Sequence, residues 1–365
     1  MISINEKKID FVFRVDANLV IGTGHLIRCL TLALILKKKK YTICFVSSFL
    51  DNNLFKYINK QGFYCKIFSK KNFNKSAFHQ FKTKNNKIFQ INDARNTLKI
   101  IENYNCRWII VDHYSLDITW ENFIKKRINK LLVIDDLANR KHNCDILLDQ
   151  NFNENLKKRY SNLVPKKCNL LLGPEYLLRR SEFEKFKVRN KNIKKVVKNI
   201  LIFFGGADKN NNTKKIIALL SSLKLLNINV NIIVGSINPF HKEIKLLCIK
   251  KKFNYYYNTN KISHHMYSSD LFIGSAGSTI WELFYLGVPS MVFITHTNQS
   301  RCIQNLHSMG ALINLGSDKK NINNLVNQKK IKSLLFNIKK RQELSKNSID
   351  IIKKNNIKKL IKLLN

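Results

Sequence analysis

The feature that most constrains the fold is a strand–loop–helix pattern that runs through the first part of the chain and starts again near residue 199. Strand-like apolar runs lie at 9–15, 42–48, 107–112, 130–136, 144–150, 199–206, 229–235, 270–277 and 289–294. They lack strict alternation of apolar and polar residues, which is typical of parallel strands covered by helices on both faces. Helical patterns follow at 25–38, 118–128, 212–226 and 239–250. The sequence therefore predicts an α/β fold with two Rossmann-like units.

A basic segment with few large apolar residues, at about 186–198, separates the two units. We therefore expect an N-terminal domain over 1–186 and a C-terminal domain over 198–365, which are ordinary lengths for domains. Each unit has a glycine loop after its first strand. Because open parallel sheets bind ligands at the carboxyl ends of their strands, two such domains would face one interdomain cleft.

The chain carries 65 Lys and Arg against 24 Asp and Glu, a formal net charge of +41. The excess is spread along the whole sequence, so we interpret it as a compositional bias and expect no nucleic-acid partner. A general attraction for anionic substrates is compatible with it. The segment 319–365 is the densest part, with 14 basic and 2 acidic residues. We expect a solvated helical surface there and leave its role, and the packing of its last helix, open.

The eight cysteines form no C-x-x-C pair and show no zinc-ligand spacing. Buried, reduced thiols are the simplest interpretation, and we expect neither a metal nor a cofactor. The N-terminal stretch MISINEKKIDFVF lacks the apolar core of a signal peptide, and no run approaches about 18 apolar residues. The sequence therefore predicts a cytoplasmic protein without a membrane partner and leaves its oligomeric state open.

The first glycine loop reads GTGHLIR, residues 22–28. Gly22 and Gly24 allow a tight turn, but the third glycine of a dinucleotide fingerprint is missing, so NAD binding is weakly supported. His25 falls in the first turn of the next helix, where the helix dipole disfavours an imidazolium ion. A neutral imidazole at this edge suits a general base for water; a histidine that only caps or packs is the alternative.

In the C-terminal unit, FFGGADKNNNT places Gly205 and Gly206 directly after a buried strand. Consecutive backbone amides at such a turn could form a nest for a diphosphate. A plain strand-to-helix turn is the alternative, with Asp208 or an asparagine as the helix N-cap.

The strongest local signal is IGSAGSTIWELFYLGVP, in which Gly277 and Ser278 let the backbone approach a ligand just before a helix. Glu282, about one turn further, could accept hydrogen bonds from a ribose diol. An exposed first-turn glutamate, favoured by the helix dipole, is the alternative. After the next strand, HTNQS supplies Asn298 and Gln299, whose amides could bind polar groups of a substrate or cap the next helix.

The segment VDHYSLD places Asp112, His113 and Tyr114 at the carboxyl end of a buried strand. Three polar side chains at such an end usually face a cleft, although each alone is more often a satisfied structural group. A metal shared by His25, His113 and Asp112 would be conceivable, but no ligand spacing supports it.

The motifs are more specific in combination. They occur in one order over about 15–300: FRVDANLVIGTGHLIRCLTLA, VDHYSLD, DDLANRKHNCDILLDQN, LLGPEYLLRRSEF, FFGGAD and GSAGSTIWELFYLGVPS, followed by NQ. This string resembles the UDP-2,4-diacetamido-2,4,6-trideoxy-β-L-altropyranose hydrolases of pseudaminic acid biosynthesis, whose wider relatives are GT-B glycosyltransferases of the MurG type. The resemblance implies a GT-B fold with the active site between the domains. It also implies metal-independent hydrolysis of the bond between the anomeric carbon and UDP.

The resemblance also implies roles for single residues. His25 matches the general base that activates water. The residues implied to contact the sugar or its diphosphate are Gly22, Gly24, Tyr114, Asn298 and Gln299. The residues implied to hold UDP are Gly205, Gly206, Gly277, Ser278 and Glu282. The family often has Ala-Glu before the Asn-Gln pair, where this chain has His296-Thr297.

The chemistry agrees with this set of residues. UDP is a good leaving group, and backbone amides can stabilise the charge that it gains. One base opposite the leaving group then suffices, and the attack inverts the anomeric centre, unlike in glycosidases that use two carboxylates. Two alternatives stay open: a related glycosyltransferase that uses an alcohol acceptor with a UDP-N-acetylated sugar, and a non-catalytic nucleotide-sugar binding protein.

Overall fold

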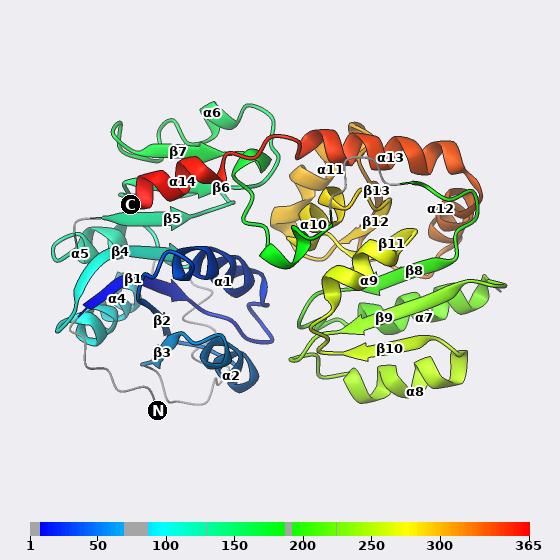
Figure 1. The fold of residues 1–365 in the computed structure, drawn as a ribbon, viewed down its shortest axis with the longest axis horizontal. Helices are drawn as coiled ribbons and strands as arrows, with labels where there is room; N and C mark the ends of the chain where they lie inside the picture. The colour runs from blue at the N-terminus through cyan, green and yellow to red at the C-terminus, as the bar shows by residue number, and fades with distance from the viewer. Residues whose placement is uncertain (1–7, 69–86, 129, 187–191, 224) are drawn as a thin grey trace.

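The computed structural model describes residues 8–68, 87–128, 130–186, 192–223 and 225–365, and these residues form two parallel sheets (Figure 1). The first sheet has seven described strands in the order β3-β2-β1-β4-β5-β6-β7. Its strands are β1 (Lys8–Val15), β2 (Ile43–Ser47), β3 (Tyr64–Ile67), β4 (Asn105–Asp112), β5 (Leu131–Ile134), β6 (Ile146–Asp149) and β7 (Asn169–Leu172). We call the part of the chain that carries this sheet the N-terminal half.

The second sheet, in the C-terminal half, has six described strands in the order β10-β9-β8-β11-β12-β13. Its strands are β8 (Asn199–Phe203), β9 (Asn229–Val234), β10 (Asn254–Tyr257), β11 (Leu271–Ser275), β12 (Ser290–Ile294) and β13 (Ile313–Ser317). Both sheets begin with the strand order of a dinucleotide-binding fold. The α/β prediction is confirmed, whereas the division at 186–198 stays a prediction.

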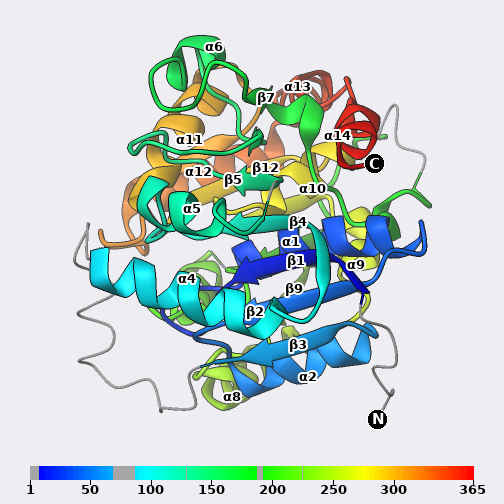
Figure 2. The ribbon, with the colours of Figure 1, turned by 90° about the vertical axis from the view of Figure 1, so that its left-hand side faces the viewer.

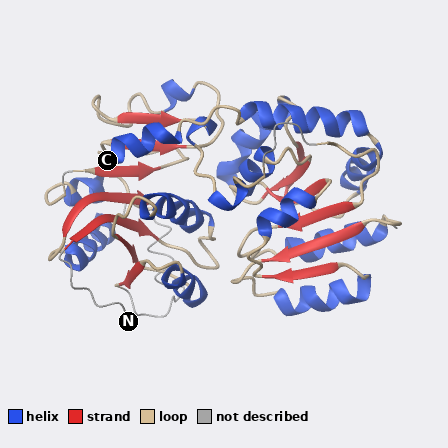
Figure 3. Ribbon diagram, viewed as in Figure 1, coloured by secondary structure: helices blue, strands red, loops and turns tan. Residues whose placement is uncertain are grey.

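Helices lie on both faces of each sheet (Figure 3). The N-terminal half has α1 (Gly24–Lys37), α2 (Asn52–Lys60), α4 (Lys87–Ile101), α5 (Ile118–Ile124), α6 (Leu156–Arg159) and η1 (Pro174–Tyr176). The next element, η2 (Ser181–Phe183), packs through Phe183 in a core cluster of the C-terminal half. The C-terminal half has α7 (Asn212–Ser222), α8 (His241–Lys251), α9 (Ile262–Ser268), α10 (Thr279–Tyr285), η3 (Thr297–Gln299), α11 (Ser300–Ser308), α12 (Leu325–Phe336) and α13 (Ile338–Ile351). The last helix is α14 (Ile357–Leu364). This cover explains why the strands are apolar on both faces.

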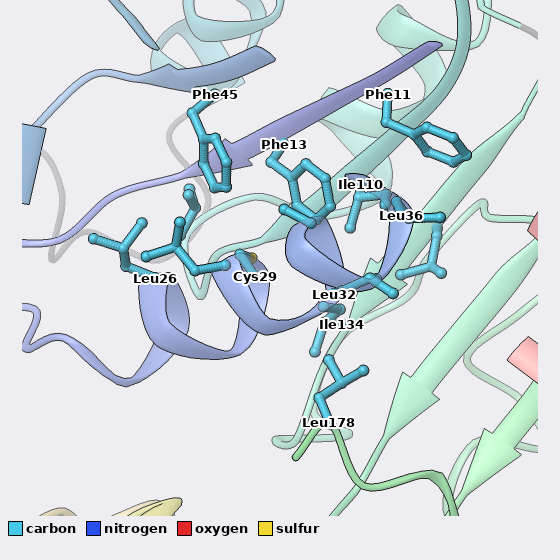
Figure 4. Close-up of a cluster of buried hydrophobic side chains, with 14 of the residues drawn as sticks. Phe11, Phe13, Leu26, Cys29, Leu32, Leu36, Phe45, Ile110, Ile134 and Leu178 are labelled. Atoms are coloured by element: carbon cyan, nitrogen blue, oxygen red, sulfur yellow. The ribbon is translucent and has the colours of Figure 1, made fainter. Parts of the chain in front are cut away.

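Helix α1 places the first glycine loop because its apolar side chains recur at helical spacing. Leu26, Cys29, Leu32 and Leu36 point toward the sheet, where they meet residues such as Phe13 (Figure 4). All four are fully buried. On the other face, α4 and α5 lie side by side (Figure 2). The rigid packing of α1 fixes its N-terminal turn at the edge of the sheet.

The C-terminal helix does not pack with the half of the chain that precedes it. Leu360 and Leu364 are fully buried in the same apolar cluster as Phe11 and α1. Figure 1 shows α14, in red, lying across the N-terminal half, after α13 has run along the C-terminal half. The last residues of the sequence therefore belong to the core of the first sheet.

Candidate functional site

The site lies where the strand order reverses in each sheet. In the first sheet β1 and β4 are neighbours, and in the second β8 and β11 are neighbours. Ligands of open α/β sheets bind outside the carboxyl ends of strands at such a switch point. Gly205 and Gly277 lie in the loops after β8 and β11, Asp112 is the last residue of β4, and His25 lies in the first turn of α1, the helix that follows β1. Topology alone therefore brings the predicted glycine loops to the ends of adjacent strands.

His25 is the second residue of α1 and lies against the carboxylate of Asp112. Its Nδ1 is 2.5 Å from Asp112 Oδ1, and its side chain is 10% exposed. The turn before it uses Gly22 at φ 88°, a left-handed conformation that favours glycine. An ionised carboxylate can only accept a hydrogen bond, so Nδ1 carries the proton and Nε2 is the basic nitrogen. The sequence analysis noted Asp112 but did not identify this pairing.

Arg28 holds Asp112 from the other side. Its Nε and Nη2 donate to the two oxygens of Asp112 at 2.5 and 2.7 Å, and its Nη1 donates to Asp136 at 3.0 Å. Burial alone would raise the pKa of Asp112, but Arg28 and His25 hold it well below its usual range. The carboxylate therefore stays ionised and orients the imidazole of His25.

Tyr114 packs against His25, and Asn298 reaches Tyr114 from the other half of the chain. The ring of Tyr114 stands edge-on to that of His25, with 4.4 Å between centroids. Its hydroxyl donates to Asp136 at 2.8 Å and accepts from Asn298 Nδ2 at 2.9 Å. Because Asn298 follows β12, this last hydrogen bond joins the two halves through the tyrosine that packs against His25.

The glycine loops of the two halves also touch. A Cβ atom added to Gly206 would lie 2.5 Å from the Oγ1 of Thr23, the residue before Gly24. Gly205 has φ 85°, and Cβ atoms added to it or to Gly277 would each lie 3.9 Å from Ser275 Oγ. The three loops therefore converge, and the lack of side chains at the glycines leaves backbone facing the space between the halves.

Asp208 acts as the helix cap that the sequence analysis gave as an alternative. Its carboxylate accepts from the backbone amides of Asn212 and Thr213 at 2.8 and 2.9 Å. Burial raises the pKa of Asp208, and these hydrogen bonds oppose that rise. Gln299 also holds backbone in place, since its Oε1 accepts a hydrogen bond from the backbone amide of Thr295 at 3.0 Å. Both side chains stabilise the loops that carry the site.

Glu282 lies in the first turn of α10, as expected, but it is buried, so the alternative of an exposed first-turn glutamate is wrong. Arg180 donates to both of its oxygens, at 2.6 and 2.7 Å. Arg180 comes from the segment after η1, 102 residues away, and the sequence analysis missed it. Glu282, Ser278 and Arg28 line a small pocket between the two halves.

His113 turns away from this site. Its ring lies 3.1 Å from Asp16 Oδ2 and is buried within the N-terminal half, so it does not join His25 around a metal. Within the described ranges, no cluster of three or more His, Cys, Asp or Glu side chains is arranged to hold a metal ion. In the same ranges, no helix has both the length and the apolar character that crossing a bilayer requires.

Comparisons with known sequences show which proteins the chain is similar to. Residues 199–364 match the glycosyltransferase family 28 C-terminal domain. The UDP-2,4-diacetamido-2,4,6-trideoxy-beta-L-altropyranose hydrolase of Campylobacter jejuni is 27% identical over 278 residues, which cover 75% of this chain and 88% of the relative. An uncharacterized protein of Methanocaldococcus jannaschii is 29% identical over 79% of this chain. The chain spans only 56% of the length of that second relative.

Solved structures with the same fold cover nearly the whole chain. MurG of Acinetobacter baumannii superposes with a TM-score of 0.60 over 97% of this chain and 99% of its own, at 15% identity. The spinosyn rhamnosyltransferase SpnG superposes with a TM-score of 0.62 over 98% of this chain and 100% of its own, at 12% identity. The fold is therefore of the GT-B type, the chain is similar to the Campylobacter hydrolase, and its second half matches the family 28 C-terminal domain.

Proposed function

We propose that this protein is a UDP-sugar enzyme of polysaccharide biosynthesis that hydrolyses UDP-2,4-diacetamido-2,4,6-trideoxy-β-L-altropyranose. The observation that carries the proposal is the His25–Asp112 pair beneath Tyr114 and Asn298, between the two halves. The similarity to the Campylobacter hydrolase supports the substrate class. A UDP-sugar placed with its uridine in the C-terminal half would present its anomeric carbon to His25.

The proposed reaction is a single displacement at the anomeric carbon. Asp112 orients the imidazole, and Nε2 of His25 takes a proton from a water molecule as its oxygen attacks the carbon. The bond between that carbon and the UDP oxygen breaks, and the diphosphate takes the electron pair. Backbone amides of the loops at Gly205, Gly206 and Gly277 stabilise the new charge. Attack opposite the leaving group inverts the anomeric configuration.

The remaining residues bind substrate in this proposal. Tyr114 and Asn298 contact the sugar or its diphosphate, while Gly22 and Gly24 let the loop approach it. Glu282 accepts hydrogen bonds from the ribose, because the two hydrogen bonds from Arg180 leave other lone pairs of its carboxylate free. Ser278, which lines the same pocket, also contacts UDP. We assign Gln299 to holding the turn that presents Asn298.

The test is proton NMR of the UDP-sugar incubated without an acceptor. We expect free sugar and UDP in equal amounts, with the inverted anomer appearing first. His25→Asn and Asp112→Asn should each lower kcat about 10²–10⁴-fold, since each disables the base. His264→Gln, an exposed histidine of α9, is the matched control and should leave the rate unchanged.

A glycosyltransferase is the second candidate, because the family 28 match covers the nucleotide-binding half that transferases share. Such an enzyme would release little free sugar until an alcohol acceptor is added. Tight UDP binding without turnover under either condition would instead indicate a non-catalytic binding protein. Full activity of His25→Asn would refute the role of His25 as the base.

A further inference from the structure

One polar side chain at the cleft has no part in the proposed mechanism. His296 follows β12 and comes two residues before Asn298, whose amide reaches Tyr114 above His25. It is exposed, and its own backbone amide is held by Gln299 Oε1 at 3.3 Å. The turn that carries His296 is therefore fixed at the carboxyl edge of the second sheet, close to the proposed reaction centre.

The hydrogen bonds of His296 define its neutral form. A ring nitrogen accepts from the backbone amide of Gln299, and Nδ1 lies 3.1 Å from Thr295 Oγ1. A neutral imidazole that accepts at one nitrogen carries its proton at the other. Protonation would make both ring nitrogens of His296 donors and would add a positive charge that favours a bound anion.

Three other elements bring charged or titratable groups near His296. Asp318 follows β13, and its backbone amide donates to Ile294 O, two residues before His296, at 3.1 Å. Lys209 lies in the loop after β8 next to Asn210, whose side-chain amide donates to Asp318. His25 of α1 packs against Tyr114, which Asn298 contacts. The surrounding protein lowers the pKa of His296, Lys209 and His25 lower it further, and Asp318 opposes them. Asp318 is engaged by the amides of Asn210 and Asn212 at 2.9 and 2.8 Å. An anionic ligand bound among these groups would contact the side chains of both Lys209 and His296.

On the basis of the proposed function, we propose that His296 and Lys209 bind the β-phosphate of the nucleoside diphosphate. His25 marks the position of the sugar carbon, and the loop of Lys209 begins at the glycines assigned to the diphosphate. The phosphate next to the sugar is the β-phosphate, so a group between these two points meets that phosphate. His296 then stabilises the charge on the leaving group.

The test compares the affinities of UDP and UMP for the wild type and for His296→Gln by calorimetry between pH 5.5 and 8. A glutamine keeps an N–H donor but cannot gain a proton. We expect His296→Gln to weaken UDP binding about tenfold at pH 5.5 and less at pH 8, because hydrogen bonds to charged groups are the stronger ones. UMP, which lacks the β-phosphate, should bind both proteins equally. His264→Gln is the control and should match the wild type.

The outcomes separate the two proposals. If the wild type binds UDP but His296→Gln binds it equally at every pH, the assignment of His296 is wrong and the proposed function stands. An equal loss for UMP and UDP also contradicts the β-phosphate assignment. If the wild type binds no UDP at any pH, the proposed function fails together with this inference. His296→Ala serves as a second variant that removes the imidazole. Because His296 is exposed, the thermal midpoint of this variant should equal that of the wild type.

Discussion

Buried carboxylates near the cleft differ in their protonation because their partners differ. Asp112 and Asp16 each face an arginine, Arg28 or Arg14, and their pKa values are lowered although burial opposes this. Asp149, at the end of β6, behaves in the opposite way. Burial and then the nearby charge of Asp136 raise its pKa to about 7, against the smaller influence of Arg159. The carboxyl edge of the first sheet therefore holds both carboxyl groups with a lowered pKa and one with a raised pKa.

Asp149 predicts a specific pH dependence of stability. Folded Asp149 keeps a proton that the unfolded chain loses near pH 4, so its contribution is full below that pH and is lost as the pH rises to about 7. Between pH 5 and pH 8 this loss is roughly 3 kcal/mol. The asparagine side chain in Asp149→Asn is neutral at every pH, so this variant does not lose stability in this way as the pH rises. Urea unfolding at both pH values should show the free energy of unfolding of the variant gaining on the wild type as the pH rises.

The hydrogen bonds of Asp149 supply a check on this expectation. Its carboxyl accepts from Arg159 Nε at 3.2 Å and from the Tyr160 hydroxyl at 3.1 Å. Losing part of this set shifts the stability of the variant by a constant amount at every pH. A constant difference between the two proteins from pH 5 to pH 8 would mean that Asp149 is ionised throughout.

At the scale of elements, the long apolar runs were well predicted and the short edge strands were not. The run at 9–15 and the helical pattern at 25–38 match β1 and α1 to within one residue. β10 (NYYY) was missed because it is a partly exposed edge strand of four residues without an apolar run. β13 contains Gly316, which weakens a strand pattern. Hydrophobic burial shapes the long central strands, whereas edge strands depend on their neighbours.

The residues of the candidate site also differ in whether the sequence could predict them. Tyr114 and Asn298 could be placed from the sequence because each follows a strand-like run, and His25 because it follows the first glycine loop. Arg180 was not, because its bidentate pairing with Glu282 joins positions 102 residues apart, and spacing within a motif carries no such information. The roles of all these residues stay predictions until they are tested.

The contact between glycine loops predicts a coupled pair of variants. In Gly206→Ala the new Cβ would lie 2.5 Å from Thr23 Oγ1 and 2.6 Å from its Cγ2. The branched side chain of Thr23 has few alternative rotamers, so the loops must separate. Overpacking of this kind costs about 1–3 kcal/mol, and we expect UDP binding to weaken at least about fivefold.

Thr23→Ala removes both of these atoms and should restore much of the affinity in the double variant. Thr23→Ala alone should bind UDP much like the wild type. Calorimetry on the four proteins gives the coupling energy between the two loops. Independent effects of the two substitutions would show that the loops do not touch in solution.

In the molecule as a whole, the C-terminal helix α14 returns to pack against the N-terminal half. Residues of this helix complete the core of the first sheet, although they follow the entire C-terminal half in sequence. Leu360 is fully buried, whereas Lys362 on the same helix is exposed. The stability of the N-terminal half therefore depends on the last turns of the chain.

Leu360→Ala should lower the free energy of unfolding of the N-terminal half by about 2–5 kcal/mol, because it leaves a cavity beneath α14. Lys362→Ala is the matched control and should change it by less than about 0.5 kcal/mol. Hydrogen exchange of α1 and β1 amides, followed by mass spectrometry, measures the effect locally. Unchanged protection of α1 and β1 in Leu360→Ala would mean that α14 does not stabilise this core.

The path of α14 also has a mechanical consequence. The chain crosses between the halves twice, once between η1 and η2 and once between α13 and α14, since Tyr176 of η1 lies in the core of the first sheet and Phe183 of η2 in that of the second (Figure 1). Asn356 ties the second crossing to the start of the first, since its backbone amide donates to Glu175 O at 2.7 Å. Two halves joined by two connecting segments that are hydrogen-bonded to each other can rotate about the line of these segments but cannot move apart. We therefore expect admission of the nucleotide to be a rotation about one axis that runs past Glu175.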